Sequence, residues 1–386
     1  MLWQHYVFRR GTELSDMWDR FFRDRPINLL YIAGRGFDPR AQTAIKQFVS
    51  NILSSAANIV AADLLLVGFD RYELDQDLEE ATEANAISLR ATFSELGATE
   101  ELNMDAHAPG EDEVGTSNAL RKGLGIILAR MRGRTDVILD VSSLPRVAYL
   151  AIMTGLLHQL VPNRSASNAL AAGGVNLQIL VAEDSRLDSA IRSEDPNADL
   201  VTIPGFSTAM YAESMQDWPM VWFPILGENR LGQLTTVINA AAAIPSDAEI
   251  CPIIPHPSRG LRRAEQLLLE YAPLLFDKLQ VPVSNALYVS ESNPFETYRQ
   301  LLGAMERYRR SLTILGGCRL AVTPLSSKLV TLGAGLACFE MRLGQTDNYG
   351  VAMPYAEPMR YVTSKADLSS ANPEIASLVL TGHAYA

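Results

Sequence analysis

The chain has 386 residues, 48% of them hydrophobic and 20% charged, and its 33 basic and 44 acidic side chains give a formal charge of −11. This length suits two or three globular domains, and the acidic balance argues against a surface for duplex nucleic acid. No run approaches the ~20 apolar residues of a membrane span, so we expect no membrane association.

The cysteines and the N-terminus indicate a cellular compartment. Cys251, Cys318 and Cys338 are too scattered for a disulfide framework or a zinc site, so we expect buried thiols and neither a metal nor a cofactor. Arginines follow the short apolar start of the chain, which is the reverse of a signal peptide. The sequence therefore predicts a cytoplasmic protein.

Short β-branched runs alternate with amphipathic stretches, a pattern typical of βα units around a largely parallel sheet. After an aromatic leader, the first half predicts strands at 28–33, 63–69, 136–141 and 176–182 and helices at 41–55, 75–96, 117–131 and 146–160. The second half predicts strands at 220–226, 249–255, 286–289, 319–323 and 350–355, and helices at 231–243, 261–275 and 328–342, with another ending at 310.

The two halves follow the same order of elements, which favours an internal duplication. We therefore predict an α/β fold of two tandem, doubly wound Rossmann-like domains with largely parallel sheets, related by a pseudo-twofold axis. The expected boundaries are a leader at 1–25, a first domain at 26–205 and a second domain at 216–386. Arg40 then aligns with Arg230, and Arg146 aligns with Lys328.

Ligands of open parallel sheets bind at the loops that follow the strands, and TPLSSKLVTLGAGL is the clearest such loop. The hydroxyls of Ser326 and Ser327, the Lys328 ammonium and the free N–H groups of the helix start suit a phosphate or a carboxylate. Ordinary helix capping is the alternative. Small residues from Gly333 onward are expected to pack against the sheet. The corresponding turn of the first half supplies Ser142, Ser143 and Arg146.

The turn GRGFDPR follows the first predicted strand, and it matches neither a dinucleotide fingerprint nor a Walker A loop. It fits a backbone loop that approaches a ligand, with Arg35 or Arg40 meeting negative charge. It fits equally a tight turn in which Asp38 caps a helix that begins with Pro39. The turn GENR of the second half supplies Arg230 in the equivalent place.

The segment HPSRGLRR is the densest positive cluster of the chain, and it contains His256, Arg259, Arg262 and Arg263. Guanidinium groups bind phosphate in a bidentate manner, so phosphate recognition is one hypothesis, and a solvated basic face is the other. His256 and Glu296 are candidate acid–base catalysts. For Glu296, which follows Asn293-Pro294, a role in starting a helix is favoured.

The run from Thr323 to Gly333 resembles the ligand motif of CARF domains, which are Rossmann-like sensors of cyclic oligoadenylates in CRISPR defence. That motif is near T-G-G-T-K-x-M-x-x-A, and this chain keeps the hydroxyls, Lys328 and a small helix residue but lacks the paired glycines. The related SAVED domain is similar to two fused CARF units. The resemblance implies a nucleotide second messenger bound across the pseudo-twofold axis, with Lys328 and Arg146 on phosphates and the loops at Arg40 and Arg230 near bases or ribose.

Three functional hypotheses follow. The first is a tandem CARF/SAVED-like protein that senses a cyclic nucleotide or another phosphorylated small molecule, in an antiviral assembly whose effector activity comes from a protein partner. The second is an enzyme that processes such a ligand, as a nucleotide hydrolase or phosphodiesterase, with His256 or Glu296 as acid or base and Arg259 and Lys328 as phosphate clamps. The third is a structural subunit that docks a partner through its aromatic leader, although such a stripe is more often core.

Overall fold

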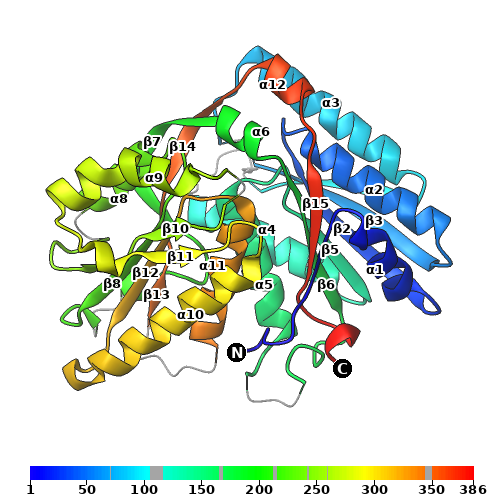
Figure 1. Ribbon diagram of the computed structural model, residues 1–386. Helices are drawn as coiled ribbons and strands as arrows, with labels where there is room; N and C mark the ends of the chain where they lie inside the picture. Colours follow the sequence, from blue (N-terminus) through cyan, green and yellow to red (C-terminus); the bar gives the residue numbers. More distant parts are fainter. Residues whose placement is uncertain are drawn as a thin grey trace, which may run out of the picture. The chain divides into compact units, whose positions relative to one another are not determined.

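The structure is a computed structural model that describes residues 1–69, 71–104, 116–164, 168–211, 215–240, 243–258, 260–343 and 350–386. The chain divides into two compact units (Figure 1). The seven-stranded unit contains Leu2–Ile191 and Tyr361–Ala386, and the six-stranded unit contains Met1 and Arg192–Arg360. This division differs from the expected boundaries, because both terminal segments join the first sheet.

The seven-stranded unit has the strand order β1-β15-β6-β5-β2-β3-β4 in its described part. Its strands are β1 (Val7–Arg10), β2 (Pro26–Arg35), β3 (Asn58–Gly68), β4 (Ala98–Asn103), β5 (Asp136–Asp140), β6 (Asn176–Glu183) and β15 (Glu374–Val379). The pairings from β4 to β6 are parallel, while β15 and β1 pair antiparallel. Numbered along the chain from β2, the five parallel strands have the Rossmann order 3-2-1-4-5.

Helices connect the parallel strands, because each connection must bring the chain from the carboxyl end of one strand back to the amino end of the next. They are α1 (Glu13–Phe22), α2 (Arg40–Ser54), α3 (Gln76–Phe93), α4 (Thr116–Met131), α5 (Arg146–Leu160), α6 (Ser185–Ala190) and α12 (Lys365–Ser369). Helices α2 and α3 run side by side over one face (Figure 1). The leader supplies Trp18 and Phe22 of α1 to the core beneath them, where they are at most 1% exposed. The leader is therefore core, and the hypothesis that its aromatic side chains dock a partner is wrong.

The six-stranded unit repeats this topology with a wholly parallel sheet. Its strands are β8 (Met220–Ile225), β9 (Glu249–Ile250), β10 (Ile253–Pro255), β11 (Leu287–Val289), β12 (Arg319–Pro324) and β13 (Val351–Ala352). The strand order is β11-β10-β8-β12-β13, and β9 also pairs with β8. If β9 and β10 are counted as one strand and the strands are numbered along the chain from β8, this order is again 3-2-1-4-5. A two-stranded sheet of β7 (Arg192–Thr202) and β14 (Pro354–Val362) completes the described strands.

The helices of the six-stranded unit follow its strands. They are α7 (Thr208–Tyr211), α8 (Leu231–Asn239), α9 (Arg263–Ala272) with its extension η2 (Pro273–Lys278), η3 (Val283–Asn285), α10 (Pro294–Ser311) with η4 (Leu312–Leu315), and α11 (Lys328–Arg342). Helices α10 and α11 pack side by side (Figure 1). Gly333 of α11 faces α10, where a β-carbon would lie 2.8 Å from Cβ of Thr297. Its small size therefore serves a close contact between helices, whereas we expected a contact with the sheet.

The predicted α/β class with largely parallel sheets is confirmed, whereas the pseudo-twofold relation stays a prediction. The helices at 146–160 and 328–342 have the bounds expected for them. The sequence did not reveal β1, β4, β7 or β15 as strands, and the last predicted strand, 350–355, covers β13 and only the start of β14. Within the described residues, no helix combines the length and the hydropathy needed to cross a bilayer.

Candidate functional site

The strand order predicts one crevice at the carboxyl edge of each sheet. In the order 3-2-1-4-5 the chain leaves strands 1 and 4 toward opposite faces, and ligands of such sheets bind where these two loops separate. In the seven-stranded unit the loops follow β2 and β5, and in the six-stranded unit they follow β8 and β12. The predicted residues of TPLSSK, VSSLPR, GRGFDPR and GENR lie on these four loops or at the ends of the strands and helices that flank them.

The crevice of the seven-stranded unit is closed by contacts between its own loops. A β-carbon on Gly34 would lie 2.9 Å from the backbone of Ser143 and Leu144. The Ser143 hydroxyl donates to the Gly34 carbonyl (2.7 Å), and the Ser142 hydroxyl accepts a hydrogen bond from the Ala182 N–H group (3.0 Å). Both predicted serines therefore hold neighbouring strand ends together.

Arg40 forms ion pairs with carboxylates of its own unit. Its side chain is 2% exposed and pairs with Asp38 and with Asp188 of α6, both at 2.6 Å. Burial lowers the pKa of the guanidinium, but the carboxylates of Asp188 and Asp38 outweigh burial and hold this pKa above its usual value. Asp38 also accepts from the Arg40 N–H group (3.1 Å), as expected if the turn caps a helix, although α2 begins at Arg40 itself.

Arg35 and Arg146 complete the predicted set of this unit. Arg35 pairs with Glu83 of α3 at 2.7 Å and approaches Glu101 of β4 at 3.9 Å. Arg146 is the first residue of α5, as Lys328 is of α11. Arg35 and Arg40 therefore pair with carboxylates of the protein, whereas the sequence predicted that one of them meets the negative charge of a ligand.

Helix α6, which carries Asp188, begins with a carboxylate cap that provides a test of the fold. The Asp184 side chain accepts from the N–H groups of Arg186, Leu187 and Asn372, at 3.0, 3.2 and 2.8 Å. Burial raises the pKa of Asp184, but these three donors outweigh it and hold the pKa below its usual value.

We expect Asp184→Ala to lower the free energy of unfolding by about 1 kcal/mol at pH 7, as for other helix caps. Because the pKa is lowered by folding, the charged form stabilises the fold above the unfolded pKa of about 3.9, and this stabilisation disappears as the pH falls through the folded value. Urea denaturation of both proteins between pH 7 and pH 2 measures the difference. A difference that does not shrink in acid, or one as small as for exposed Glu73→Ala, would contradict this role.

In the six-stranded unit, the loops that follow β8 and β12 also approach each other closely. A β-carbon on Gly227, after β8, would clash with the Leu325 carbonyl oxygen, after β12. Thr323, the hydroxyl residue nearest the end of β12, accepts from the Trp222 indole N–H group (2.9 Å) and so belongs to the sheet.

The start of α11 differs from the capped helix starts. Ser327 occupies its N-cap position, but the side chain makes no cap hydrogen bond. The Ser327 hydroxyl oxygen is buried and has no hydrogen-bond partner among the described residues. In α10, by contrast, the Asn293 side chain accepts from the Phe295 N–H group (3.0 Å). Beside Ser327 lie Ser326, which is 4% exposed, and half-buried Lys328, the first residue of the helix. This arrangement leaves a buried hydroxyl and a helix N-terminus able to bind an anion.

Helix α9 holds the opposite loop of this crevice. The Tyr271 hydroxyl donates to the Gly227 carbonyl (2.6 Å), and the Glu270 carboxylate accepts from the N–H group of Asn229 (3.1 Å), whose φ is +57°. Burial raises the pKa of Glu270, the neighbouring Glu228 carboxylate adds to this rise, and the N–H groups of Asn229 and Arg230 oppose it. The loop that carries Arg230 is thereby fixed in position. No local pattern revealed Glu270 or Tyr271, because they lie on a different element.

The described residues of the predicted basic cluster have different surroundings. Arg263 is buried and pairs with Glu228 (2.9 Å) and with Glu291. Because Glu228 follows β8 and Glu291 follows β11, these two ion pairs connect the two loops. Arg262 is exposed, and Arg259 lies outside the described residues. The exposed ring of His256 lies 6.0 Å from that of Tyr288.

The other candidate catalyst, Glu296, is the third residue of α10 and pairs with Arg299 (3.3 Å). This contact is the surface pairing expected of a helix start. In the part of the chain that is described, no group of three or more His, Cys, Asp or Glu side chains is arranged to bind a metal ion.

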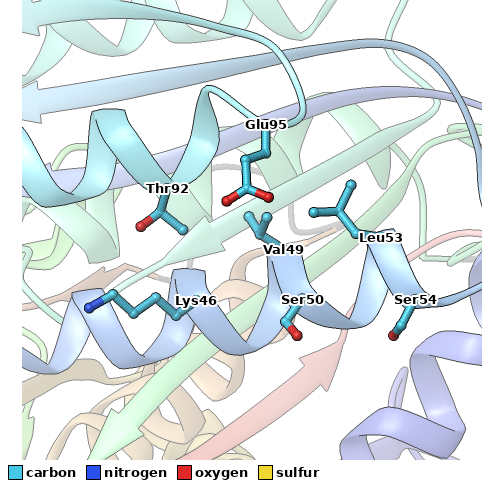
Figure 2. A pocket seen from close by; sticks show the side chains of 7 residues that line it. All are labelled: Lys46, Val49, Ser50, Leu53, Ser54, Thr92 and Glu95. Atoms are coloured by element: carbon cyan, nitrogen blue, oxygen red, sulfur yellow. The ribbon is translucent and has the colours of Figure 1, made fainter.

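A shallow groove of about 600 Å³ lies between α2 and α3 (Figure 2). Val49 and Leu53 line it together with Lys46 of α2 and Glu95 beyond α3. The groove follows the later turns of both helices, toward the amino ends of the strands, and contains none of the predicted site residues.

No protein-family model and no curated protein matches the sequence. Among solved structures, a Type III CRISPR defence DNA nuclease activated by cyclic oligoadenylate is similar, with a TM-score of 0.41 and 11% sequence identity over 81% of this chain. The chain covers 64% of that nuclease chain.

Proposed function

We propose that the chain is a CARF/SAVED-like sensor that binds a cyclic nucleotide or another phosphorylated small molecule at the start of α11. The observation that carries the proposal is the buried Ser327 hydroxyl, which has no partner among the described residues at the N-cap position of a 15-residue helix. An unpaired buried polar group costs about 1–3 kcal/mol, and a phosphate oxygen would satisfy it.

Charge and location support a phosphorylated ligand. The start of α11 combines the Ser327 hydroxyl, the Lys328 ammonium and the positive end of the helix dipole, and Arg230 lies on the facing loop of the same crevice. Arg35 and Arg40 of the other unit pair with carboxylates, so we assign the phosphate to the six-stranded unit. The adenylate ligand and the antiviral assembly with an effector partner are carried over from the motif resemblance of Thr323 to Gly333.

Ser327→Ala separates binding from folding. Because this hydroxyl makes no hydrogen bond within the described protein, its removal is expected to leave the free energy of unfolding unchanged or slightly higher. Loss of a charge-assisted bond to phosphate is expected to weaken ligand binding about tenfold or more. A loss of stability like that of Asn293→Ala, about 1 kcal/mol, would instead assign Ser327 to capping.

Lys328→Ala tests the same site through its charge. Calorimetric titration with cyclic oligoadenylates, cyclic dinucleotides, ATP and inorganic phosphate is expected to show binding of at least one nucleotide by the native protein, weakened about tenfold or more in the variant. Lys278→Ala, at an exposed lysine of the same unit beyond α9, is the matched control. Chromatography of the bound ligand distinguishes binding from turnover. If no nucleotide binds, or if both lysine variants bind like the native protein, the proposal fails.

A further inference from the structure

The turn that ends α10 exposes apolar side chains. It lies at the end of the six-stranded unit opposite to the start of α11. Ile314 is 89% exposed and Leu315 is 59% exposed in η4. Because η4 precedes β12, this turn lies at the amino end of that strand, whereas the start of α11 lies at its carboxyl end. Two neighbouring aliphatic side chains with this exposure contribute nothing to the core of their own unit.

A tryptophan extends this apolar surface. Trp218 lies two residues before the start of β8, the neighbour of β12, and its half-buried ring lies over the two glycines that follow Leu315. A β-carbon on Gly317 would lie 2.8 Å from Cζ3 of the indole, and both glycines have positive φ values, +92° and +139°. The glycine turn therefore lets the ring lie against the backbone beside the exposed aliphatic residues. Tryptophan and arginine are the residue types enriched at the centres of protein interfaces.

The last turns of α10 carry more positive than negative charge, since Arg307, Arg309 and Arg310 stand against Glu306, in contrast to the net charge of −11 of the chain. Arg307 and Arg310 are exposed near the end of α10, and among the described residues neither forms an ion pair with a carboxylate. Arg310 is exposed and donates its Nε–H group to the Glu306 carbonyl (3.2 Å). Half-buried Arg309 adds a third positive charge. Burial lowers the pKa of Arg319 of β12, and the nearby carboxylates of Asp247 and Asp217 oppose this shift only in part.

We infer that this surface, the α10–η4 tip, docks an acidic segment of a partner protein through apolar anchor residues. The tip consists of Trp218, Arg307, Arg310, Ile314 and Leu315. Its arginines match carboxylates within the ~8 Å range of charge interactions at physiological salt, and its aliphatic side chains match one or two apolar anchors.

A bilayer fits the tip less well than a protein segment does. Two aliphatic side chains bury little area, and the acidic remainder of the chain opposes anionic lipid. The identity of the partner as the effector of the sensor rests on the proposed function, but the docking surface does not, because it lies at the opposite strand ends from the start of α11.

Site-specific photo-crosslinking tests the surface on the full chain. A benzophenone amino acid at position 314, expressed in the native host, is expected to capture a protein segment that the same group at exposed Leu269 of α9 does not capture. The captured segment is then identified by mass spectrometry and synthesised as a fluorescent peptide. We expect an acidic sequence with apolar residues that binds the native protein with a dissociation constant in the micromolar range.

Matched variants decide the outcome. Arg310→Glu and Ile314→Asp are expected to weaken peptide binding at least tenfold, while Arg262→Glu and Leu269→Asp, at exposed positions on or next to α9, leave it unchanged. None of these residues belongs to the anion site, so nucleotide binding is expected to persist in all four variants. The inference is overturned by a basic or uncharged captured segment, by equal binding of tip and control variants, by no capture above that at Leu269, or by preferential crosslinking to phosphatidylserine vesicles.

Discussion

Arg40→Met is expected to lower the free energy of unfolding by about 3–5 kcal/mol, because it leaves two carboxylates without their cation. Arg40 is 2% exposed, and Asp38, which shares its charge, is 9% exposed at the side chain. Asp188 of α6 would also lose its ion pair with the start of α2. Urea denaturation monitored by circular dichroism measures the change.

Arg35→Met is the matched control for this prediction. Arg35 also pairs with a glutamate, but its side chain is 30% exposed and that of Glu83 is 50% exposed. Solvent-exposed pairs contribute about 0–1 kcal/mol, so this variant is expected to remain near the native stability. Equal losses in the two variants would show that the buried ion pair has no special role in closing this crevice.

Gly333→Ala is expected to destabilise the six-stranded unit, against the usual preference of helices for alanine. In most helices this substitution stabilises by about 1 kcal/mol. At Gly333, however, the new β-carbon would clash with the Pro294 carbonyl and lie 2.8 Å from Cβ of Thr297. Overpacking of this kind costs about 1–3 kcal/mol and moves α10 away from α11.

Gly125→Ala in α4 is expected to change the free energy of unfolding in the opposite direction to Gly333→Ala. Nothing lies within 4 Å of the added β-carbon, and the position is exposed in a helix interior, so we expect a stabilisation of about 1 kcal/mol. Chemical denaturation of the two variants under identical conditions tests both values. Stabilisation by both substitutions would contradict the close contact of α10 with α11.

The parallel core could be predicted from the sequence because its information is local. Each central strand of the core is a short apolar run. The mostly buried helices α5 and α11 are longer apolar stretches, and they begin and end where expected. The shared order of elements also placed Lys328 and Arg146 correctly as first residues of corresponding helices.

The contribution of the two ends of the chain could not be predicted, because it depends on pairing over the full length. Val7 of β1 pairs with Val379 of β15, and β15 pairs with β6. No periodicity within either segment specifies such a partner. The segment Glu374–Val379 therefore looked like an unassigned tail, and the leader looked like an appendage, although both belong to the first sheet.

The candidate site also has features that could be predicted from the sequence and features that could not. Strand order and loop position could be predicted, since the carboxyl ends of parallel strands share one edge. The partner of Arg40 could not, because Asp188 lies 148 residues away on a helix that no pattern revealed. Burial of the Ser327 hydroxyl likewise depends on packing around α11, so the sequence alone could not distinguish anion binding from capping at that helix.

The most direct test of the proposed function is a crystal structure of the chain with the nucleotide that binds most tightly in the calorimetric titration. We expect a phosphoryl group at the N-terminus of α11, within hydrogen-bonding distance of the Ser327 hydroxyl and the first N–H groups of the helix. A ligand bound elsewhere in the chain, with the Ser327 hydroxyl still without a partner at saturating concentration, would contradict the proposal.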